Sequence, residues 1–496
     1  MEKKIKIKLL AVFISAVLIS VAVLIGVSIQ GDERENVTYN IDATVDGAYL
    51  SGVLELFYVN KNNFDVDELF FCLYPNAFKN EDNVNNTTLT DRFNDAYPNG
   101  FNEGYIQIKK VTVEDESVNY GFEESEQILR VETGKIKKGR NKRVVIEFEE
   151  KLPNSLSRYG YGGNTYNFGN WYPVLCPFVD GEAVNCTYTS NGDPFFSECA
   201  DYNVKLSLSP EFRIASSGEI LSKKIINPLS TEWNIKGTNI RDFAFIISTD
   251  YKLKSTTVGD TIVYSYYLEN DKAGERALDF AVNALKCFNE LFGKYPYSTL
   301  SVAESNFYIG GMEYPNLVFI SDELYVDAAY DALEEVVVHE TAHQWWYGLV
   351  GNNEIDDAWL DEGVTQYSVA LYYEDIYGKE RYNSFMNESE SYCKAIFEVL
   401  KRKNKNINKK INRKSFEFEH WLLYDVLSYD VSALMIDELR NVIGDDLFFS
   451  GLKNYFEENK FKISSKDVFI NSFNNSTKKN ISGIIEPWLE GKIYWG

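Results

Sequence analysis

Three side chains that could bind one metal ion lie between His339 and Glu362. The run Val336-Val-Val-His-Glu-Thr-Ala-His343 is followed by Gln-Trp-Trp and then by Trp359-Leu-Asp-Glu362-Gly. In an α-helix, residues four positions apart lie on one face, so His339 and His343 can reach a single ion. This H-E-x-x-H spacing is typical of zinc hydrolases. Glu362 follows after an eighteen-residue gap and can supply the third ligand.

The chemistry of such a site follows from its ligands. Two imidazoles and one carboxylate leave a fourth position for water, and zinc lowers the pKa of that water to about 7. Glu340, next to a ligand but not itself one, can accept the proton and return it to a leaving amine. An oxyanion forms in such a hydrolysis, so we expect a second donor besides the metal. We predict one Zn²⁺ per chain.

Histidine on an apolar helix face is more often a core residue than a ligand, so the context of the pair matters. Burying Glu340 beside Val336–Val338 would be costly without a charged partner, and a metal ion is the simplest one. The chain has only one other histidine, His420, which lies far along the sequence without a partner motif. We interpret His420 as structural.

Length, composition and charge restrict the kind of protein. A chain of 496 residues is too long for one compact core, and 45% apolar with 15% aromatic residues is typical of globular domains. The net charge of −24 argues against nucleic acid or an anionic lipid surface as the main partner. Six cysteines without a C-x-x-C pair favour buried free thiols over a disulfide scaffold.

The N-terminus predicts a membrane anchor in residues 1–30. Lysines at positions 3, 4, 6 and 8 precede an uncharged run of twenty-one residues, 9–29. At about 1.5 Å per residue this run spans roughly 31 Å as a helix, the thickness of the bilayer core. It is longer than the apolar region of a cleaved signal peptide and no small-residue cleavage site follows, so we favour an uncleaved anchor. The lysines should remain cytoplasmic, which makes this a single-pass protein of the cell membrane with an extracytoplasmic catalytic domain.

Residues 36–255 carry the pattern of a β-rich domain. Short alternating or β-branched runs such as Tyr49–Tyr58, Gln127–Glu132 and Arg143–Phe148 are separated by Asn, Asp and Gly. Such strands are expected to form a sandwich or saddle packed against the next domain. The aromatic, Gly/Asn-rich stretch Asn164–Cys176 is predicted to be a structured loop.

Residues 256–496 are predicted to be a mostly helical domain. Apolar residues recur at helical spacing from Ala273 until just before Pro296, and a short strand is expected at Leu300–Ala303. The helix with the histidines is predicted from about Asp327 to about Leu349, and a second helix carries Trp359–Tyr373. The predicted class is therefore α+β multidomain.

These motifs resemble the aminopeptidase N family of zinc metallopeptidases, gluzincins with a thermolysin-like catalytic domain. The family pattern of H-E-x-x-H, eighteen residues and E in a W-L-x-E-G setting matches His339–Trp346 and Trp359–Gly363. The resemblance implies that this chain is a hydrolase with metalloprotease activity, which removes N-terminal residues from peptide substrates by means of zinc-bound water and Glu340.

The G-x-M-E-N segment of the family is similar to the run of Gly310, Gly311, Met312, Glu313 and Tyr314, with Tyr in place of Asn. The resemblance implies that Glu313 holds the α-amino group of the substrate. It also implies that the preceding glycines let the substrate backbone pair alongside.

The catalytic tyrosine of the family lies in a Y-x-K-G-A context, to which Tyr429–Leu439 is most similar. Val431 and Ser432 replace the Lys and Gly of that pattern. By resemblance Tyr429 is the oxyanion donor, and Tyr424 is the second candidate.

Two departures from the family leave other functions open. No acid in Tyr166–Pro173 matches the second amine contact that the family takes from its N-terminal domain, and no large helical domain follows Trp495. Both favour an endopeptidase or processing protease as the alternative. A different class, a non-catalytic extracytoplasmic module associated with a membrane transporter or sensor, has no need of Glu340. The sequence contains no motif that identifies a protein partner.

Overall fold

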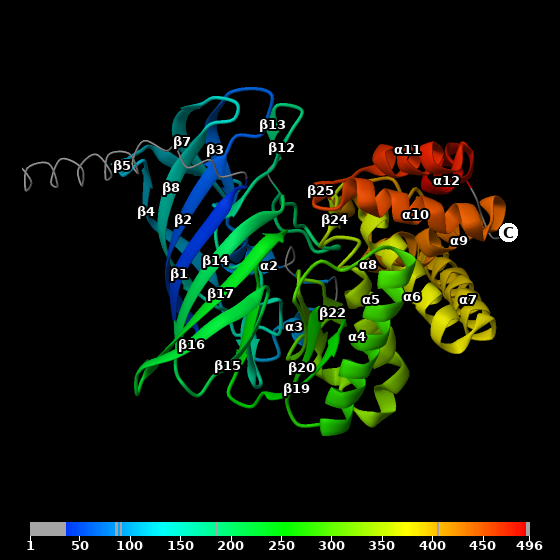
Figure 1. Ribbon diagram of the computed structural model, residues 1–496, viewed down its shortest axis with the longest axis horizontal. Helices are drawn as coiled ribbons and strands as arrows, with labels where there is room; N and C mark the ends of the chain where they lie inside the picture. Colours follow the sequence, from blue (N-terminus) through cyan, green and yellow to red (C-terminus); the bar gives the residue numbers. More distant parts are fainter. Residues whose placement is uncertain (1–35, 85–87, 90–91, 185, 404–405, 493–496) are drawn as a thin grey trace, which may run out of the picture.

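The computed structural model describes residues 36–84, 88–89, 92–184, 186–403 and 406–492, in which a β-rich half lies beside a mostly helical half (Figure 1). The predicted anchor in residues 1–30 lies outside the described residues. Among the helices that are described, none has both the length and the apolar composition needed to cross a bilayer. The coarse division into a β-rich N-terminal part and a helical C-terminal part agrees with the predicted fold class.

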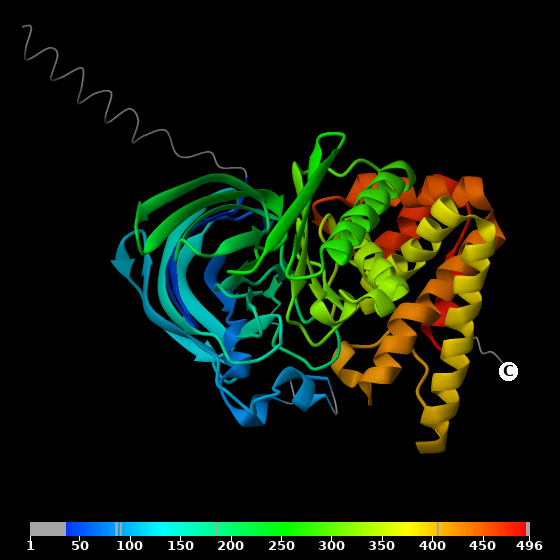
Figure 2. The same ribbon diagram turned by 90° about the horizontal axis from the view of Figure 1, so that it is seen from below.

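A strongly curved sheet of eight strands dominates the first half (Figure 2). The alternating burial of β2, in which every second residue is buried, shows that one face packs on the core and the other meets solvent. Strands β1 and β14 pair in parallel, and every other neighbouring pair is antiparallel. In spatial order the strands are β16 (Glu219–Asn227), β17 (Ser230–Ile240), β14 (Ala200–Leu208), β1 (Thr38–Asp46), β2 (Tyr49–Val59), β8 (Asn141–Lys151), β4 (Tyr105–Val113) and β5 (Glu116–Ser117).

Smaller sheets and short helices complete the β-rich half. One four-stranded sheet contains β15 (Arg213–Ser216), β18 (Phe245–Ser248), β10 (Thr165–Phe168) and β9 (Tyr159–Gly162). Another contains β11 (Val174–Leu175), β3 (Val66–Cys72), β7 (Ile128–Ile136) and β6 (Tyr120–Glu123). The short elements are η1 (Tyr74–Phe78), α2 (Glu81–Val84), α3 (Phe93–Ala96), β12 (Phe178–Val179) and β13 (Glu182–Ala183).

The stretch Asn164–Cys176, predicted to be a loop, instead contributes β10 and β11 to these sheets. Its residues lack the alternation of a half-exposed strand because the aromatic rings of Phe168, Trp171 and Tyr172 are all buried. All six cysteines are free thiols, and five of them are buried.

A five-stranded mixed sheet lies between the two halves and brings substrate-binding candidates to its edge. Its strands are β19 (Lys252–Val258), β20 (Thr261–Tyr267), β21 (Thr299–Ser305), β23 (Leu317–Ser321) and, at the edge, β22 (Gly311–Met312). The predicted domain boundary at residue 255 falls inside β19, so the division into domains remains a prediction. Strands β21 and β23 are buried at every residue.

The helix that carries His339 and has His343 as its C-cap, α5 (Tyr330–Ala342), is shorter than its apolar periodicity predicts. The prediction that it continues to about Leu349 is wrong because the chain turns after His343 and then enters β24 (Val350–Gly351). The guanidinium of Arg241 donates hydrogen bonds to the carbonyls of Tyr347 (2.7 Å) and Ser197 (2.6 Å), and so ties this turn to the β-rich half. Burial of Trp345 and Trp346 in the turn explains why the pattern looks helical.

Two long helices pack directly on α5. Its neighbours are α4 (Asp271–Leu291), which also packs on the five-stranded sheet, and α6 (Ala358–Tyr377), which carries the third predicted ligand. The remaining elements are η2 (Asp322–Leu324), η3 (Asp327–Ala329), α7 (Lys379–Lys403), η4 (Ser415–Glu417), α8 (Trp421–Val426), η5 (Leu427–Val431), α9 (Ser432–Ile443), α10 (Asp445–Asn459), β25 (Lys462–Ile463), α11 (Lys466–Thr477) and α12 (Ser482–Leu489).

Candidate active site

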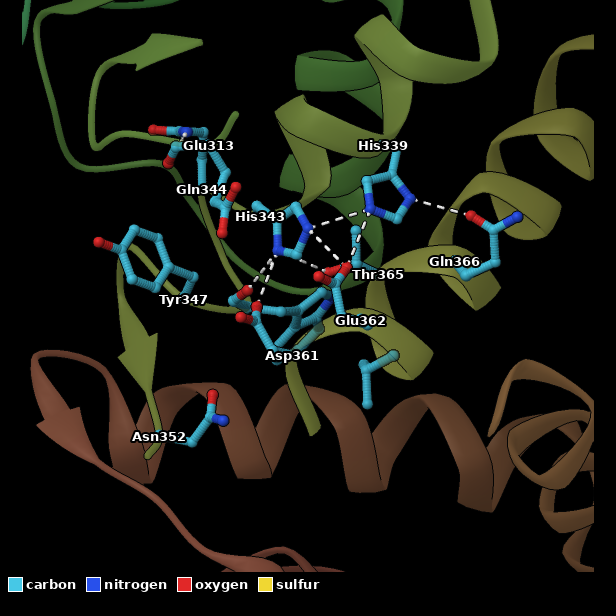
Figure 3. Close-up of polar contacts among 12 residues, drawn as sticks. Glu313, His339, His343, Gln344, Tyr347, Asn352, Asp361, Glu362, Thr365 and Gln366 are labelled. Atoms are coloured by element: carbon cyan, nitrogen blue, oxygen red, sulfur yellow. Dashed lines mark hydrogen bonds and ion pairs between the residues drawn. The ribbon is translucent and has the colours of Figure 1, made fainter. Parts of the chain in front are cut away.

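Helices α5 and α6 bring the three predicted zinc ligands together (Figure 3). The Nε2 atoms of His339 and His343 lie 3.1 Å apart, and each lies 3.3 Å from Oε2 of Glu362. Ligands held about 2.0–2.1 Å from a tetrahedral ion lie roughly 3.3 Å from one another. Donor types and spacing therefore fit zinc.

Neighbouring side chains orient both imidazoles. Nδ1 of His339 lies 2.9 Å from Oε1 of Gln366. Nδ1 of His343 is surrounded by a carboxylate oxygen of Asp361 (2.8 Å), the carbonyl of Trp346 (3.0 Å) and the hydroxyl of Thr365 (3.2 Å). Oxygen acceptors at Nδ1 favour the tautomer with the proton on that atom, which leaves the lone pair of Nε2 free for a metal.

Glu362 is buried, and both oxygens of its carboxylate have polar contacts. Burial alone would raise the pKa of this carboxyl, but hydrogen bonds with His339 and His343 outweigh burial and lower its pKa to about 2. The hydroxyl of Tyr429 donates a hydrogen bond to the other oxygen, Oε1, at 2.5 Å. The ring of Tyr429 also stacks on the imidazole of His339, with 5.7 Å between centroids.

Tyr429 lies in η5, a π-helical turn between α8 and α9. Such turns are rare in proteins and frequent at functional sites, because the extra residue redirects a side chain. Tyr424, the second candidate, points its hydroxyl at Gly192, where an added Cβ would lie 2.2 Å from it. Thus Tyr429, rather than Tyr424, has its hydroxyl hydrogen-bonded to the predicted zinc ligand Glu362.

Glu340 is buried beside His343 and Glu313. Burial is the main cause that raises the pKa of its carboxyl to about 7, and the neighbouring His339 and His343 oppose the shift. Its Oε2 atom accepts no hydrogen bond from the residues that the structure describes. A Cβ on Gly311 would lie 2.3 Å from Oε1, so only glycine leaves room for this carboxylate.

Glu313 follows the edge strand β22 and is 3% exposed. Oxygen and nitrogen atoms of Glu313, Glu340 and His343 all lie within 4.8 Å of one another. Burial raises the pKa of Glu313 well above its ordinary value, and its Oε1 has no hydrogen-bond partner among the described residues. Figure 3 shows Glu313 and Gln366 on opposite sides of the histidine pair.

A cavity of about 570 Å³ opens onto this site. Its lining includes Gly310, Gly311 and Glu313 together with His339 and Glu340. Met312, predicted with them, is instead buried in the hydrophobic core and is absent from the lining. A volume of this size is typical of a site for a small ligand.

Two residues of the β-rich half, Arg158 and Asp193, also line the cavity. They form an ion pair with both side chains largely buried, and one oxygen of Asp193 lies within 4.8 Å of oxygens of Glu313 and Glu354. Sequence reasoning missed both residues, since neither belongs to a recognisable motif. The Gly192-Asp193-Pro194 turn was the only available signal.

His420 lies outside this site, in agreement with a structural role. Its Nδ1 accepts a hydrogen bond from the backbone N–H of Leu422 (3.1 Å) and so caps the N-terminus of α8.

Comparisons with known proteins agree with this geometry. Residues 276–488 match the peptidase family M1 domain. The chain is 24% identical to aminopeptidase N of Lactobacillus delbrueckii subsp. lactis, over 79% of this chain and 46% of that protein. It is also 24% identical to endoplasmic reticulum aminopeptidase 2 of Bos taurus, over 67% of this chain and 36% of the relative. The chain thus spans less than half the length of these relatives.

Solved structures show the same fold over nearly the whole chain. The M1 zinc metallopeptidase of Deinococcus radiodurans has a TM-score of 0.66 at 15% identity, covering 93% of this chain and 94% of its own. An E323A mutant of that protein, bound to a Tyr-Ser-Ala substrate, has a TM-score of 0.64 at 14% identity and covers 93% of this chain and 95% of its own. Together with the zinc-binding motif, these matches confirm the resemblance inferred from the sequence: residues 276–488 match the peptidase family M1 domain, and the chain is similar to aminopeptidase N-like zinc metallopeptidases.

Proposed function

We propose that this protein is a zinc aminopeptidase, which hydrolyses the first peptide bond of peptides with a free N-terminus. The observation that carries the proposal is the buried carboxylate of Glu313, which faces Glu340 and His343 and has an oxygen without a partner among the described residues. The family match supports the hydrolytic chemistry, and Glu313 supports the preference for a free amine.

Zinc would be held by His339, His343 and Glu362, whose mutual distances fit it. When bound, it supplies a Lewis acid that activates water and polarises the peptide carbonyl. The contacts of Gln366 and Asp361 with the two Nδ1 atoms keep the imidazoles turned toward the ion.

Glu340 is proposed as the general base and acid. It accepts a proton from the attacking water and delivers the proton to the nitrogen of the leaving amine. Burial raises the pKa of this carboxyl, and a general base and acid works best when its pKa lies near the working pH. The glycine at position 311 leaves the space that this carboxylate needs.

Tyr429 is proposed to stabilise the transition state. The carbonyl oxygen of the substrate gains negative charge during attack, and a hydroxyl donor beside the ligands can offset that charge. The hydroxyl of Tyr429 donates a hydrogen bond to Glu362 and is therefore next to the reacting atoms in this scheme.

Glu313 and Asp193 are proposed to bind the α-ammonium group of the substrate. Both line the cavity, and Asp193 supplies from the β-rich half the second acid that was not found in Tyr166–Pro173. A protonated amine would place a positive charge between two largely buried carboxylates, whereas a blocked N-terminus would leave them unneutralised. This contrast favours exopeptidase over endopeptidase activity.

A non-catalytic module is the less supported alternative. A protein that only binds a partner gains nothing from a buried carboxylate at position 340, which is expensive to desolvate. The presence of Glu340 together with a complete ligand set therefore favours catalysis.

We also propose that residues 9–29 anchor the protein in the cell membrane, with the catalytic domain outside the cytoplasm. The support is the length of the uncharged run and the lysines that precede it. Carbonate extraction of membranes, followed by protease treatment of intact cells, tests both points. Release of the protein by carbonate, or protection from the protease, would contradict them.

Aminoacyl reporter substrates test the proposed activity. Metal-depleted protein should release no reporter, and one equivalent of zinc per chain should restore release. The matched control is an N-acetylated aminoacyl reporter, which should stay intact. A protein that carries one zinc per chain and cleaves no member of a broad aminoacyl panel would rule the proposal out.

A further inference from the structure

Three acids converge behind the site where the substrate amine is proposed to bind. One carboxylate oxygen each from Asp193, Glu313 and Glu354 lies within 4.8 Å of the others. They come from three places in the chain: the loop after β13, the end of β22 and the turn between β24 and α6. Glu313 and Glu354 are 3% and 2% exposed, so water cannot solvate their charges.

Several polar atoms in and beside this acid triad (Asp193, Glu313 and Glu354) have no hydrogen-bond partner among the described residues. Neither carboxylate oxygen of Glu354 accepts a hydrogen bond from the described residues, and Oε1 of Glu313 accepts none either. The hydroxyl of Tyr347 is buried without a partner among the same residues. Burial, followed by the carboxylates of Asp242, Glu354 and Glu313, raises the pKa of the Tyr347 hydroxyl well above its ordinary value. The backbone of Tyr347 has a φ of 141°, which non-glycine residues rarely adopt.

The positive charges nearby do not balance the triad. Arg158 forms its ion pair with Asp193 and is also close enough to Glu313 to interact with it, so one guanidinium is set against the three carboxylates of the triad. No lysine or arginine of the described chain forms an ion pair with Glu313 or Glu354 within 4 Å, and Glu340 and Asp361 add negative charge close by. Buried carboxylates in this arrangement must either take up protons or bind a cation.

We propose that Asp193, Glu313 and Glu354 form a second metal site, distinct from the zinc site, that binds a divalent cation such as Mn²⁺. Carboxylate oxygens are the ligands that Mg²⁺, Ca²⁺ and Mn²⁺ prefer, whereas the two-histidine site suits zinc. An ion held by all three acids would occupy Glu313 and Asp193, and it would therefore exclude the ammonium group of a substrate. This consequence rests on the proposed function, but metal binding itself does not.

The test measures binding first and inhibition second. Protein loaded with one zinc per chain is titrated with Mn²⁺, and free Mn²⁺ is followed by electron paramagnetic resonance without any substrate. We expect one Mn²⁺ to bind per chain while the zinc content stays constant, since zinc outcompetes Mn²⁺ at nitrogen ligands. Mn²⁺ should then raise the KM for a free-amine reporter and leave kcat unchanged.

Two variants make the test specific. Glu354→Gln should weaken Mn²⁺ binding by about tenfold or more, because removal even of an indirect contact to a metal costs about 10–100-fold. The matched control is Asp356→Asn, in the same turn but on the surface, which should bind Mn²⁺ as the natural protein does. Absence of a bound Mn²⁺, or equal binding by the Glu354→Gln protein, would overturn the metal site. Tight binding with an inactive zinc protein would instead point to an error in the proposed function.

Discussion

The polar atoms on the two sides of the His339–His343 pair differ in how completely they are hydrogen-bonded. On the side of Gln366 and Glu362, called the paired side, Gln366 contacts His339, and both oxygens of Glu362 have partners in Tyr429 and the histidines. The carboxylates of Glu313, Glu340 and Glu354 form what is called the open side. Each of them has at least one buried oxygen without a partner among the described residues. The polar side chains of the paired side thus satisfy one another, whereas the open side holds buried carboxylate oxygens that no side chain of the described residues satisfies.

The largest effect should come from the open side. Glu340→Gln keeps the size of the side chain but removes the base, so kcat should fall by about 10²–10⁴-fold. Zinc content should stay near one per chain, since Glu340 is not a ligand in this scheme. Steady-state kinetics with metal analysis checks both quantities. Asp331→Asn, on the exposed face of the same helix, is the control, and persisting turnover in the Glu340→Gln protein would reject the mechanism.

On the paired side, Tyr429→Phe removes one hydroxyl. If this hydroxyl stabilises the oxyanion, kcat should fall by about 10²–10³-fold with little change in KM. Tyr424→Phe is the matched control, because Tyr424 is a buried neighbour whose ring lies 6.3 Å from that of Tyr429. A larger loss of kcat in the Tyr424→Phe protein would move the role to Tyr424.

Glu313→Gln tests whether the open side binds the substrate amine. Loss of one buried charge partner costs about 2–4 kcal/mol, so kcat/KM for free-amine peptides should fall roughly 30- to 1,000-fold. Zinc affinity should be unchanged, because the substitution leaves the three ligands intact. A Glu313→Gln protein that loses zinc but keeps its KM would place Glu313 in the metal site and contradict the division into two sides.

Gln366→Leu should weaken zinc binding, in contrast to Glu313→Gln, which should weaken substrate binding. Without its acceptor, the Nδ1–H of His339 is unsatisfied and the imidazole is less well oriented, so zinc should bind about 10–100-fold more weakly. Competition with a chelator measures this affinity. Gln366→Glu, which keeps an oxygen acceptor, should retain most of it. Equal zinc affinity in the Gln366→Leu protein would show that this contact does not orient the ligand.

The smallest effect concerns stability. Burial among other acids raises the pKa of Glu354 well above its ordinary value, so the folded protein holds a proton that the unfolded chain releases above about pH 4.5. Stability therefore falls as the pH rises through that range. Glu354→Gln removes the free-energy cost of ionising this buried carboxyl. Tm at pH 8 without added Mn²⁺ should therefore rise by about 2–4 °C. The gain should vanish near pH 4, and a lower Tm at pH 8 would contradict this account.

The sequence was most informative where one motif carries several ligands. The spacing of His339, His343 and Glu362 predicted a zinc site, and the structure brings the three together because their helices, α5 and α6, pack side by side. The helix with Ala277 and Phe288 was also predicted well, since its apolar residues repeat regularly on one face.

The sequence was least informative where the geometry depends on distant contacts. Arg241 ties down the turn after His343, so the end of α5 is set by the β-rich half rather than by local propensity. Asp193 reaches Glu313 only through the packing of the two halves, and Glu354 reaches it through packing within the helical half. Spacing along the chain carries no signal for such acids, and neither residue belongs to a motif.

The most direct test of the central claim compares matched peptides with zinc-loaded protein. A tripeptide with a free N-terminus and its N-acetylated form differ only in the charge that Glu313 and Asp193 are proposed to bind. We predict that kcat/KM for the free peptide is higher by about 10²-fold or more, from the loss of a buried charge pair. Equal kcat/KM values for the two peptides would contradict the aminopeptidase account and favour an endopeptidase.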